Sequence, residues 1–221
     1  MGPSGTNDSA LAHGEPTGDF DVHAPLASLP GVFGTTLDTI PAKVPYLFSD
    51  SVALDEWQLE LAGERRLKVG INWQGSQTTE IDASRSFPLS LFARIAQLQG
   101  VALYSLQIGA GREQLADFAR TSPIIDLADR LGDFYNTAAV VCNLDLVISC
   151  DSAPVHLAGG LGVKTWLSQC WSPHWTWMLD RDDSPWYPTL RLFRQGADGN
   201  WASAVAKAVD ALHRAINTVS E

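Results

Sequence analysis

From Leu67 onward, short apolar runs alternate with segments whose apolar residues recur every three or four positions. The apolar runs predict strands, and the second spacing predicts helices. The predicted strands are Leu67–Trp73, Val101–Gln107, Ile124–Leu127, Leu146–Cys150, Lys164–Ser168 and Leu190–Phe193. The predicted helices are Leu89–Leu98, Arg112–Arg120, Asp133–Cys142, Ala153–Leu161 and Trp201–Ile216. Strand–helix alternation at this spacing is typical of βαβ units, so we expect an α/β fold: a Rossmann-like parallel sheet with helices on both faces.

The first 64 residues lack this regularity. Residues 1–19 are rich in Gly, Ser, Pro and Asp, with little apolar surface to bury, and predict a disordered tail. Residues 20–64 carry many prolines among scattered apolar residues, which predicts an irregular packed segment with one helix near Asp55–Ala62. Residues 65–221 then form the Rossmann-like domain.

Composition narrows the class of protein. The chain has 221 residues, of which 45% are hydrophobic and 18% charged, as in a globular domain with a real core. A net charge of −10 argues against binding to nucleic acid or to an anionic membrane surface. Cys142 and Cys150 lie in apolar runs, and the three cysteines have no metal-type spacing, so we expect free thiols in a reducing compartment. No apolar run reaches membrane-spanning length and no leader pattern opens the chain, which predicts a cytoplasmic protein without a membrane span.

The run from Leu146 to Gly162 carries the clearest chemical signal. A buried strand stops at Asp151 and turns directly into a helix, for which Asp151 and Ser152 are favourable N-cap residues and Pro154 is tolerated. Unpaired N–H groups at a helix start favour an anion, and ligands of open α/β sheets bind beyond the carboxyl ends of strands. The pattern therefore indicates a phosphate- or nucleotide-binding corner. A plain strand-to-helix connection with a capping Asp is the commoner alternative.

A polar loop after the first strand would face the same crevice. Gly75 lets the backbone approach a ligand, the hydroxyl of Ser76 is a donor, and the planar cation of Arg85 suits a diphosphate. The alternative is a surface loop in which Arg85 pairs with Asp82.

Three further features have two interpretations each. The second strand ends in Gln107 and a glycine-bearing turn, after which Glu113 either accepts hydrogen bonds from a ribose or is a first-turn Glu favoured by the helix dipole. His156 either points into the crevice or is a satisfied core histidine. The aromatic residues between 171 and 186 form either a sugar-stacking surface or the packing of a long loop; they are Trp171, His174, Trp175, Trp177 and Trp186.

Several motifs together resemble a known family. Trp73-x-Gly75, Arg85-Ser86-x-Pro88-Leu89 and the block from Leu144 to Ala158 are similar to the C-terminal domain of heptosyltransferase-like (family 9) glycosyltransferases. The resemblance is greatest to the glycosyltransferase-like halves of bacterial tetratricopeptide-repeat proteins. Residues 20–30, 37–42, 180–188 and 191–195 support it, so it covers nearly all of the chain from 20 to 195.

The resemblance implies a GT-B architecture, in which two Rossmann-like domains face a cleft and the C-terminal one holds the nucleotide-sugar donor. It places Asp151–Ala153 at the donor phosphates or sugar, Arg85 at the diphosphate and Glu113 near the ribose. It implies no metal and no cofactor, the nucleotide-diphosphate sugar being the donor substrate. The candidate nucleotide-sugar-binding residues are Trp73, Gly75, Ser76, Arg85, Gln107, Glu113, Asp151, Ser152, Ala153 and His156.

The chain departs from the family in ways that bear on activity. Residues 20–64 correspond only to a remnant of the N-terminal GT-B domain and linker, and the tetratricopeptide repeats are absent. Thr79 stands where relatives often carry His, and Ser152 where they often carry Thr. We therefore expect the C-terminal half of a GT-B glycosyltransferase, which needs a missing N-terminal domain to transfer sugar. The expected partner is an N-terminal glycosyltransferase domain or a tetratricopeptide-repeat region, in trans or upstream. The alternatives are a catalytically inactive nucleotide- or partner-binding module and a structural module for self-association.

Overall fold

A computed structural model describes residue 11, residues 14–77 and residues 83–219. Residues 217–219 are described by their backbone alone. Thr79, Asp82 and most of the predicted tail lie outside the described residues. The chain divides into two compact units, Met1–Ile40 and Pro41–Glu221. The first unit has only short helical turns, η1 (Leu26–Ser28), α1 (Leu29–Val32) and η2 (Leu37–Thr39), and none of its described side chains is buried.

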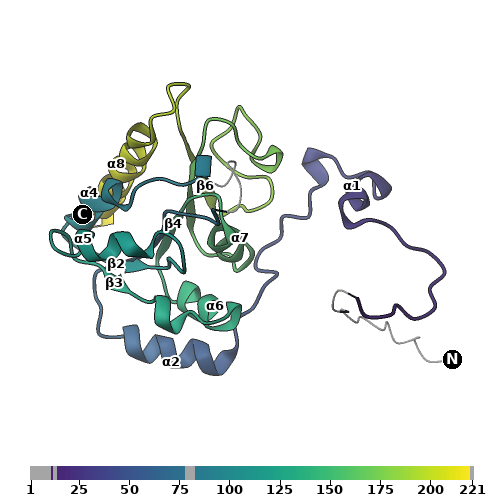
Figure 1. Cartoon of the computed structure of the whole chain (residues 1–221), viewed down its shortest axis with the longest axis horizontal. Helices are drawn as coiled ribbons and strands as arrows, with labels where there is room; N and C mark the ends of the chain where they lie inside the picture. The colour runs from purple at the N-terminus through teal and green to yellow at the C-terminus, as the bar shows by residue number, and fades with distance from the viewer. Residues whose placement is uncertain (1–10, 12–13, 78–82, 220–221) are drawn as a thin grey trace. The chain divides into compact units, whose positions relative to one another are not determined.

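The second unit is built on a six-stranded sheet. Its strands are β1 (Leu67–Asn72), β2 (Val101–Ser105), β3 (Ile125–Asp126), β4 (Leu146–Ser149), β5 (Thr165–Gln169) and β6 (Leu190–Arg194). They lie in the order β3-β2-β1-β4-β5-β6, and each pair of neighbours is parallel. Figure 1 labels β2, β3, β4 and β6 among the helices of this unit. Val69 of β1 stands opposite Leu103 of β2 on one side and Leu146 of β4 on the other. The predicted parallel sheet is confirmed, and the strand order reverses between β1 and β4.

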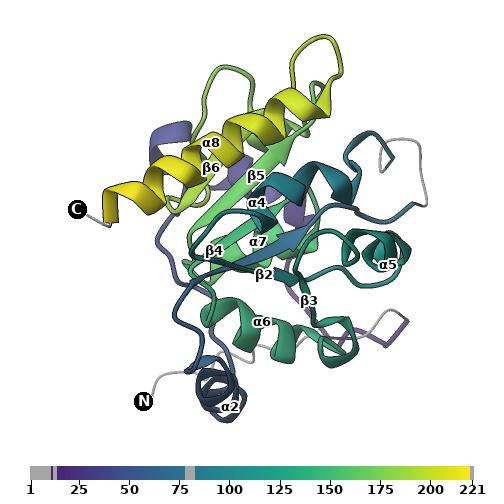
Figure 2. The ribbon, with the colours of Figure 1, turned by 90° about the vertical axis from the view of Figure 1, so that its left-hand side faces the viewer.

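Helices cover both faces of this sheet (Figure 2). They are α2 (Ser51–Leu61), η3 (Leu89–Phe92), α4 (Ala93–Ala96), η4 (Arg112–Gln114), α5 (Leu115–Phe118), η5 (Ala128–Arg130), α6 (Phe134–Cys142), α7 (Ala153–Gly160), η6 (Trp175–Trp177) and α8 (Trp201–Val219). One layer holds α4, α5 and α8, and the other holds α2, α6 and α7. The predicted helices Asp133–Cys142, Ala153–Leu161 and Trp201–Ile216 are present with ends shifted by up to three residues. In place of Leu89–Leu98 and Arg112–Arg120, the chain forms a 3-10 turn followed by a four-residue α-helix.

The two core layers follow from the alternation of side chains along the strands. Val69 and Ile71 of β1 are fully buried against the α4–α8 layer, whereas Tyr104 of β2 and Val147 of β4 are buried against the α6 layer. Because both faces are covered, the strands read as continuous apolar runs rather than as alternating ones. The last helix, α8, buries one side only, with Val205, Ala208, Val209 and Leu212 inside the core.

Helix α2 begins four residues before its predicted start at Asp55. The carboxylate of Asp50 accepts hydrogen bonds from the N–H groups of Val52 and Ala53, both at 3.0 Å, and so caps an earlier first turn. Trp57 and Leu61 are the buried residues of this helix, and they pack against the α6 layer. Within the described ranges, none of the helices combines the length and the apolar character that a membrane crossing requires.

Candidate functional site

A cavity of about 270 Å³ opens at the carboxyl ends of β1 and β4, where the strand order reverses. We call it the switch-point cavity. Its walls come from the loop after β1, the loop after β2 and the first turns of α6 and α7. Such a reversal point is where open α/β sheets bind their ligands, because the loops diverge there to opposite faces of the sheet.

Asn72 holds the floor of the switch-point cavity together. It is 3% exposed and lies at the last position of β1. Its Nδ2 donates a hydrogen bond to Oε1 of Gln107 at 2.9 Å, and its Oδ1 accepts one from Oγ of Ser152 at 2.7 Å. One side chain therefore ties β1 to the loops that follow both of its neighbours. The sequence analysis did not identify Asn72, although a single amide side chain at the end of an apolar strand could have indicated a residue of the site.

Gln107 shapes the wall of the cavity. It is 2% exposed, and its Oε1 accepts hydrogen bonds from the backbone N–H groups of Trp73 (3.2 Å) and Gln74 (3.0 Å). Its Nε2 donates to the carbonyls of Gln74 (2.9 Å) and Ala110 (2.7 Å). The amide therefore joins the loops after β1 and β2. Both of its polar atoms are hydrogen-bonded within the protein, to backbone groups and to Asn72.

Ser152 occupies the N-cap position of α7, as predicted, but its side chain does not cap the helix. The hydroxyl turns away from the helix toward Asn72. The expectation that Asp151 or Ser152 caps this helix through its side chain is therefore wrong, because the buried amide of Asn72 takes the hydroxyl. Gly75 and Ala153 line the cavity nearby, and a Cβ on Gly75 would stand 3.8 Å from Cβ of Ser152.

Three charged or titratable side chains meet beside the cavity. Asp151 is 4% exposed; its Oδ2 is 4.0 Å from Nη1 of Arg85, and its Oδ1 is 3.8 Å from Nε2 of His156. Both distances exceed that of a hydrogen bond. Within the part of the chain that the structure describes, Oδ2 of Asp151 accepts no hydrogen bond. A buried carboxylate oxygen with no donor is costly, so this oxygen is suited to accept a hydrogen bond from a ligand.

His156 is not a core histidine, because its side chain is 47% exposed. The ring stacks on the buried ring of Trp177, with centroids 5.2 Å apart and planes 26° apart. Partial burial lowers the pKa of His156, and the nearby carboxylate of Asp151 opposes this effect. The ring is therefore mainly neutral at pH 7 and carries one donor and one acceptor.

The other predicted site residues differ in how they lie relative to the switch-point cavity. Ser76 is exposed and lines the switch-point cavity. Trp73 is fully buried in the α4–α8 core layer, so only its backbone is near the cavity. Glu113 is exposed, and its Oε2 accepts the N–H of Gly111 at 2.8 Å, which leaves one carboxylate oxygen outside this turn. Phe134 and Thr137 of α6 line the cavity and were missed, since their helical spacing gave no chemical signal.

The aromatic stretch after β5 has a mixed role. Trp177 is 1% exposed and packs under His156, whereas Trp171 and Trp175 are 60% and 68% exposed. Trp186 donates its Nε1–H to the carbonyl of Thr176 at 3.0 Å, which closes the loop. Loop packing therefore accounts for Trp177 and Trp186, and in part for Trp175, whose ring meets that of Trp186 edge to face at 6.1 Å. It does not account for the exposed ring of Trp171.

An apolar groove of about 540 Å³ adjoins the switch-point cavity and shares Phe134 and Ala153 with it. Phe134 and Tyr135 of α6 are 65% and 71% exposed along it, and the opposite side comes from residues 46–48. His156 lies at its rim, so the groove and the charged cluster meet at one side chain.

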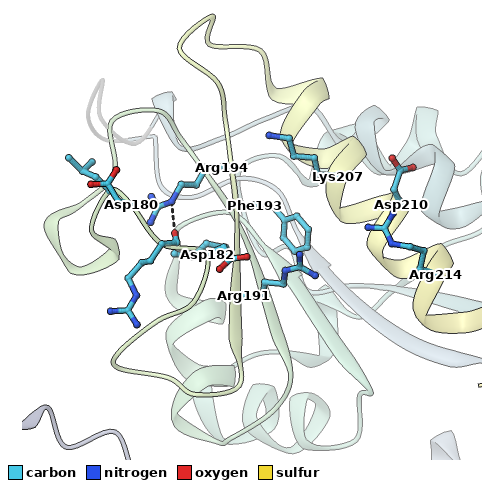
Figure 3. Close-up of a pocket in the computed structure, with 11 residues that line it drawn as sticks. Asp180, Asp182, Arg191, Phe193, Arg194, Lys207, Asp210 and Arg214 are labelled. Carbon is cyan, nitrogen blue, oxygen red and sulfur yellow. Dashed lines mark hydrogen bonds between the residues drawn. The ribbon is translucent and has the colours of Figure 1, made fainter. Parts of the chain in front are cut away.

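A third cavity, of about 680 Å³, lies along the edge strand β6 and α8 (Figure 3). Arg191 comes from β6, and Lys207 and Arg214 come from α8. Arg194 donates to the backbone carbonyl of Arg181 at 2.8 Å, and Asp210 is 3.4 Å from the guanidinium of Arg94. Five basic and three acidic side chains line this cavity, but it lies along an edge of the sheet and away from the switch point, so it is the weaker candidate.

No metal-type cluster of three or more His, Cys, Asp or Glu side chains occurs among the described residues. The three cysteines are free, with Cys150 and Cys170 buried and Cys142 half-buried.

Comparisons with known proteins agree with this geometry. The protein FlbA of Caulobacter vibrioides is 28% identical over 200 residues, which cover 87% of this chain and 33% of FlbA. The ADP-heptose lipopolysaccharide heptosyltransferase II of Escherichia coli superposes with a TM-score of 0.58 at 15% identity, over 85% of this chain and 58% of that one. A family 9 glycosyltransferase of Veillonella parvula superposes with a TM-score of 0.61 at 15% identity, over 86% of this chain and 57% of that one. No protein-family model matches the chain.

The chain thus spans about a third of FlbA and somewhat more than half of each solved structure. A six-stranded parallel sheet that covers this share of a two-domain glycosyltransferase is one of its Rossmann-like halves. The expected resemblance is confirmed at the level of the fold: this chain is a sequence relative of FlbA and has the fold of one half of the heptosyltransferase-like family 9 glycosyltransferases.

Proposed function

We propose that this chain is the donor-binding domain of a GT-B glycosyltransferase of the heptosyltransferase type, which binds a nucleotide-diphosphate sugar at the switch-point cavity. The observation that carries the proposal is the cluster of Arg85, Asp151 and His156 beside a cavity at the reversal of the strand order. The fold shared with two family 9 structures supports it.

The residues of the cluster suit the parts of such a donor. A diphosphate is anionic and needs fixed positive groups, which Arg85 and the first turn of α7 supply although the chain as a whole carries a net charge of −10. The same groups stabilise the charge that develops on a departing nucleoside diphosphate, which is electrostatic catalysis without a metal. Asp151, with one buried oxygen that accepts no hydrogen bond from the described residues, suits a sugar or ribose hydroxyl.

Transfer itself requires groups from outside this sheet. In the GT-B arrangement, the base that activates the acceptor hydroxyl comes from the facing domain, so we propose that catalysis needs an N-terminal glycosyltransferase domain. The alternative is a catalytically inactive module that binds a nucleotide or a protein partner. The exposed aromatic side chains of the apolar groove favour a partner in that case.

Calorimetric titration with ADP, UDP and GDP and with their sugar conjugates tests donor binding. We expect saturable binding of one nucleotide, weakened by Arg85→Ala and by Asp151→Ala about tenfold or more, since hydrogen bonds to charged groups contribute roughly 1.5–3 kcal/mol. Arg120→Ala and Asp117→Ala are the matched controls, because they remove an exposed Arg–Asp pair, 3.4 Å apart, at the end of α5. No binding at millimolar nucleotide, or an equal loss in the control variants, would contradict the proposal.

An activity assay distinguishes a glycosyltransferase domain from a catalytically inactive binding module. The chain is combined with the N-terminal domain of its relative, and release of nucleoside diphosphate from the bound conjugate is followed with and without acceptor. Turnover that depends on Arg85 identifies an enzyme, and binding without turnover identifies the module.

A further inference from the structure

The end of helix α7 carries two adjacent glycines, and each makes room for one tyrosine. A Cβ on Gly159 would stand 2.6 Å from Cδ1 of Tyr187, and a Cβ on Gly160 would stand 3.2 Å from Cζ of Tyr46. The carbonyl of Gly160 also accepts the N–H of Tyr46 at 2.9 Å, which fastens the segment before α2 to this helix. Glycine is otherwise unfavourable inside a helix, so its use here points to the close approach of the two rings.

The two tyrosines lead to the charged cluster. Burial raises the pKa of Tyr187, and the neighbouring side chain of Tyr46 raises it further. The hydroxyl of Tyr187 is 3.1 Å from Nδ1 of His156, one helical turn before Gly159. The other ring nitrogen, Nε2, is 3.8 Å from Oδ1 of Asp151. A continuous chain of polar groups therefore runs from Tyr187 to the cavity.

The carboxylate at the end of this chain fixes the direction of its hydrogens. A lone pair on Nε2 would face the negative oxygen of Asp151, whereas an N–H there faces it favourably. The neutral ring carries only one N–H, so Nδ1 is then the acceptor and Tyr187 must donate to it.

We propose that Tyr187 is a positioning residue: its hydroxyl donates to Nδ1 of His156 and holds the ring as the Nε2–H tautomer, with that N–H directed at the crevice beside Asp151. Trp177 fixes the plane of the ring by stacking, and Tyr187 fixes which nitrogen carries the hydrogen. The use of this N–H rests on the proposed function: in the donor complex it donates to an oxygen of the diphosphate.

Four charged or titratable groups act on His156. Burial lowers its pKa, Asp151 raises it, and His174 and Arg85 lower it further. The hydroxyl of Tyr187 is the group in direct hydrogen-bond contact. Because a hydrogen bond donated to Nδ1 stabilises the neutral ring, its loss raises the pKa of His156.

The test is nuclear magnetic resonance of the chain labelled with ¹⁵N-histidine, in which long-range ¹H–¹⁵N correlations report the tautomer of each ring. His156→Gln assigns the signal among the five histidines. We expect the native protein to show His156 as a single Nε2–H tautomer. In Tyr187→Phe we expect averaged ring-nitrogen shifts and a raised pKa of His156.

The matched control is Tyr135→Phe, because Tyr135 is a 71%-exposed ring on α6 outside this chain of polar groups. Gly159→Ala is a second route to the same effect, since its Cβ displaces the ring of Tyr187, and with it the hydroxyl, without removing any polar group from the chain. An unchanged tautomer and pKa of His156 in folded Tyr187→Phe and Gly159→Ala would overturn the proposal.

Nucleotide titrations separate this proposal from the proposed function. We expect Tyr187→Phe to weaken binding of the preferred nucleotide roughly threefold to tenfold, while Arg85→Ala weakens binding without changing the tautomer. A Tyr187-dependent tautomer without nucleotide binding would refute the donor site alone. Nucleotide binding with an unaffected tautomer would refute the positioning role alone.

Discussion

The most decisive stability experiment is Gln107→Leu. Leucine keeps the apolar stem of the side chain and removes its amide, so the change isolates the hydrogen bonds at the floor of the switch-point cavity. Three donors lose their acceptor: the backbone N–H groups of Trp73 and Gln74, and Nδ2 of Asn72. Two of these three residues are 3% and 7% exposed and the third is fully buried, so water does not replace the lost bonds without rearrangement.

The magnitude follows from these three donors. Each buried donor without a partner costs about 1–3 kcal/mol, and relaxation of the loops into the adjacent cavity favours the lower end of that range. We therefore expect Gln107→Leu to lower the free energy of unfolding by about 3 kcal/mol, out of roughly 5–15 kcal/mol for a domain. The melting temperature should fall by roughly 6–12 °C, at 2–4 °C per kcal/mol for a domain of this size.

Urea unfolding followed by tryptophan fluorescence measures this effect, with the slope checked for two-state behaviour. The control is Gln97→Leu at the exposed end of α4, which should change the free energy of unfolding by less than about 0.5 kcal/mol. A Gln107→Leu variant as stable as this control would refute the structural role. If Gln107→Leu were as stable as the control and yet bound nucleotide more weakly, Gln107 would be a ligand contact rather than a residue that stabilises the loops.

Two further changes test the surroundings of the site. Burial raises the pKa of the Cys150 thiol to about 12, so the unfolded chain loses this proton from about pH 9 while the folded chain keeps it, and stability must fall as pH rises above 9. Cys150→Ala should make the decline between about pH 8 and pH 10 shallower in urea titrations, and an unchanged slope would contradict its burial. Gly160→Ala places a Cβ 2.7 Å from Cδ1 of Leu47 and should accelerate proteolysis within residues 43–49. Gly63→Ala, where a Cβ meets nothing within 4 Å, should leave the cleavage rate unchanged.

The sheet was predictable from the sequence because its strands are buried on both faces. The prediction Leu146–Cys150, for example, is one residue longer than β4. The parallel direction of the strands followed from the helices predicted between them. The start of α2 was not predictable from apolar spacing, because Ser51–Leu54 shows no periodicity and the first turn is set by the cap at Asp50. Propensity decides a helix interior, whereas a single polar side chain decides where the helix begins.

The candidate site was predictable only in part. Its location followed from the carboxyl ends of two strands, and Asp151, Arg85 and His156 do come together there. The tyrosines near His156 could not be found from the sequence, because Tyr46 and Tyr187 lie far apart along the chain and meet only across the glycines of α7. Pairings of this kind depend on packing between elements, which no local pattern encodes.

The polar residues at the switch point fall into two layers with different functions. The amides of Asn72 and Gln107 are buried and bonded to backbone or to neighbouring side chains, so they stabilise the loops whether or not a ligand is present. Arg85 and His156 lie 4.0 Å and 3.8 Å from the two carboxylate oxygens of Asp151, beyond hydrogen-bond distance, so these contacts leave hydrogen-bonding capacity for the oxygens and hydroxyls of a ligand. A loss of nucleotide affinity therefore identifies a contact only in the second layer. In the first layer, the same loss follows from a collapsed loop, so every affinity measured there must be read beside the free energy of unfolding.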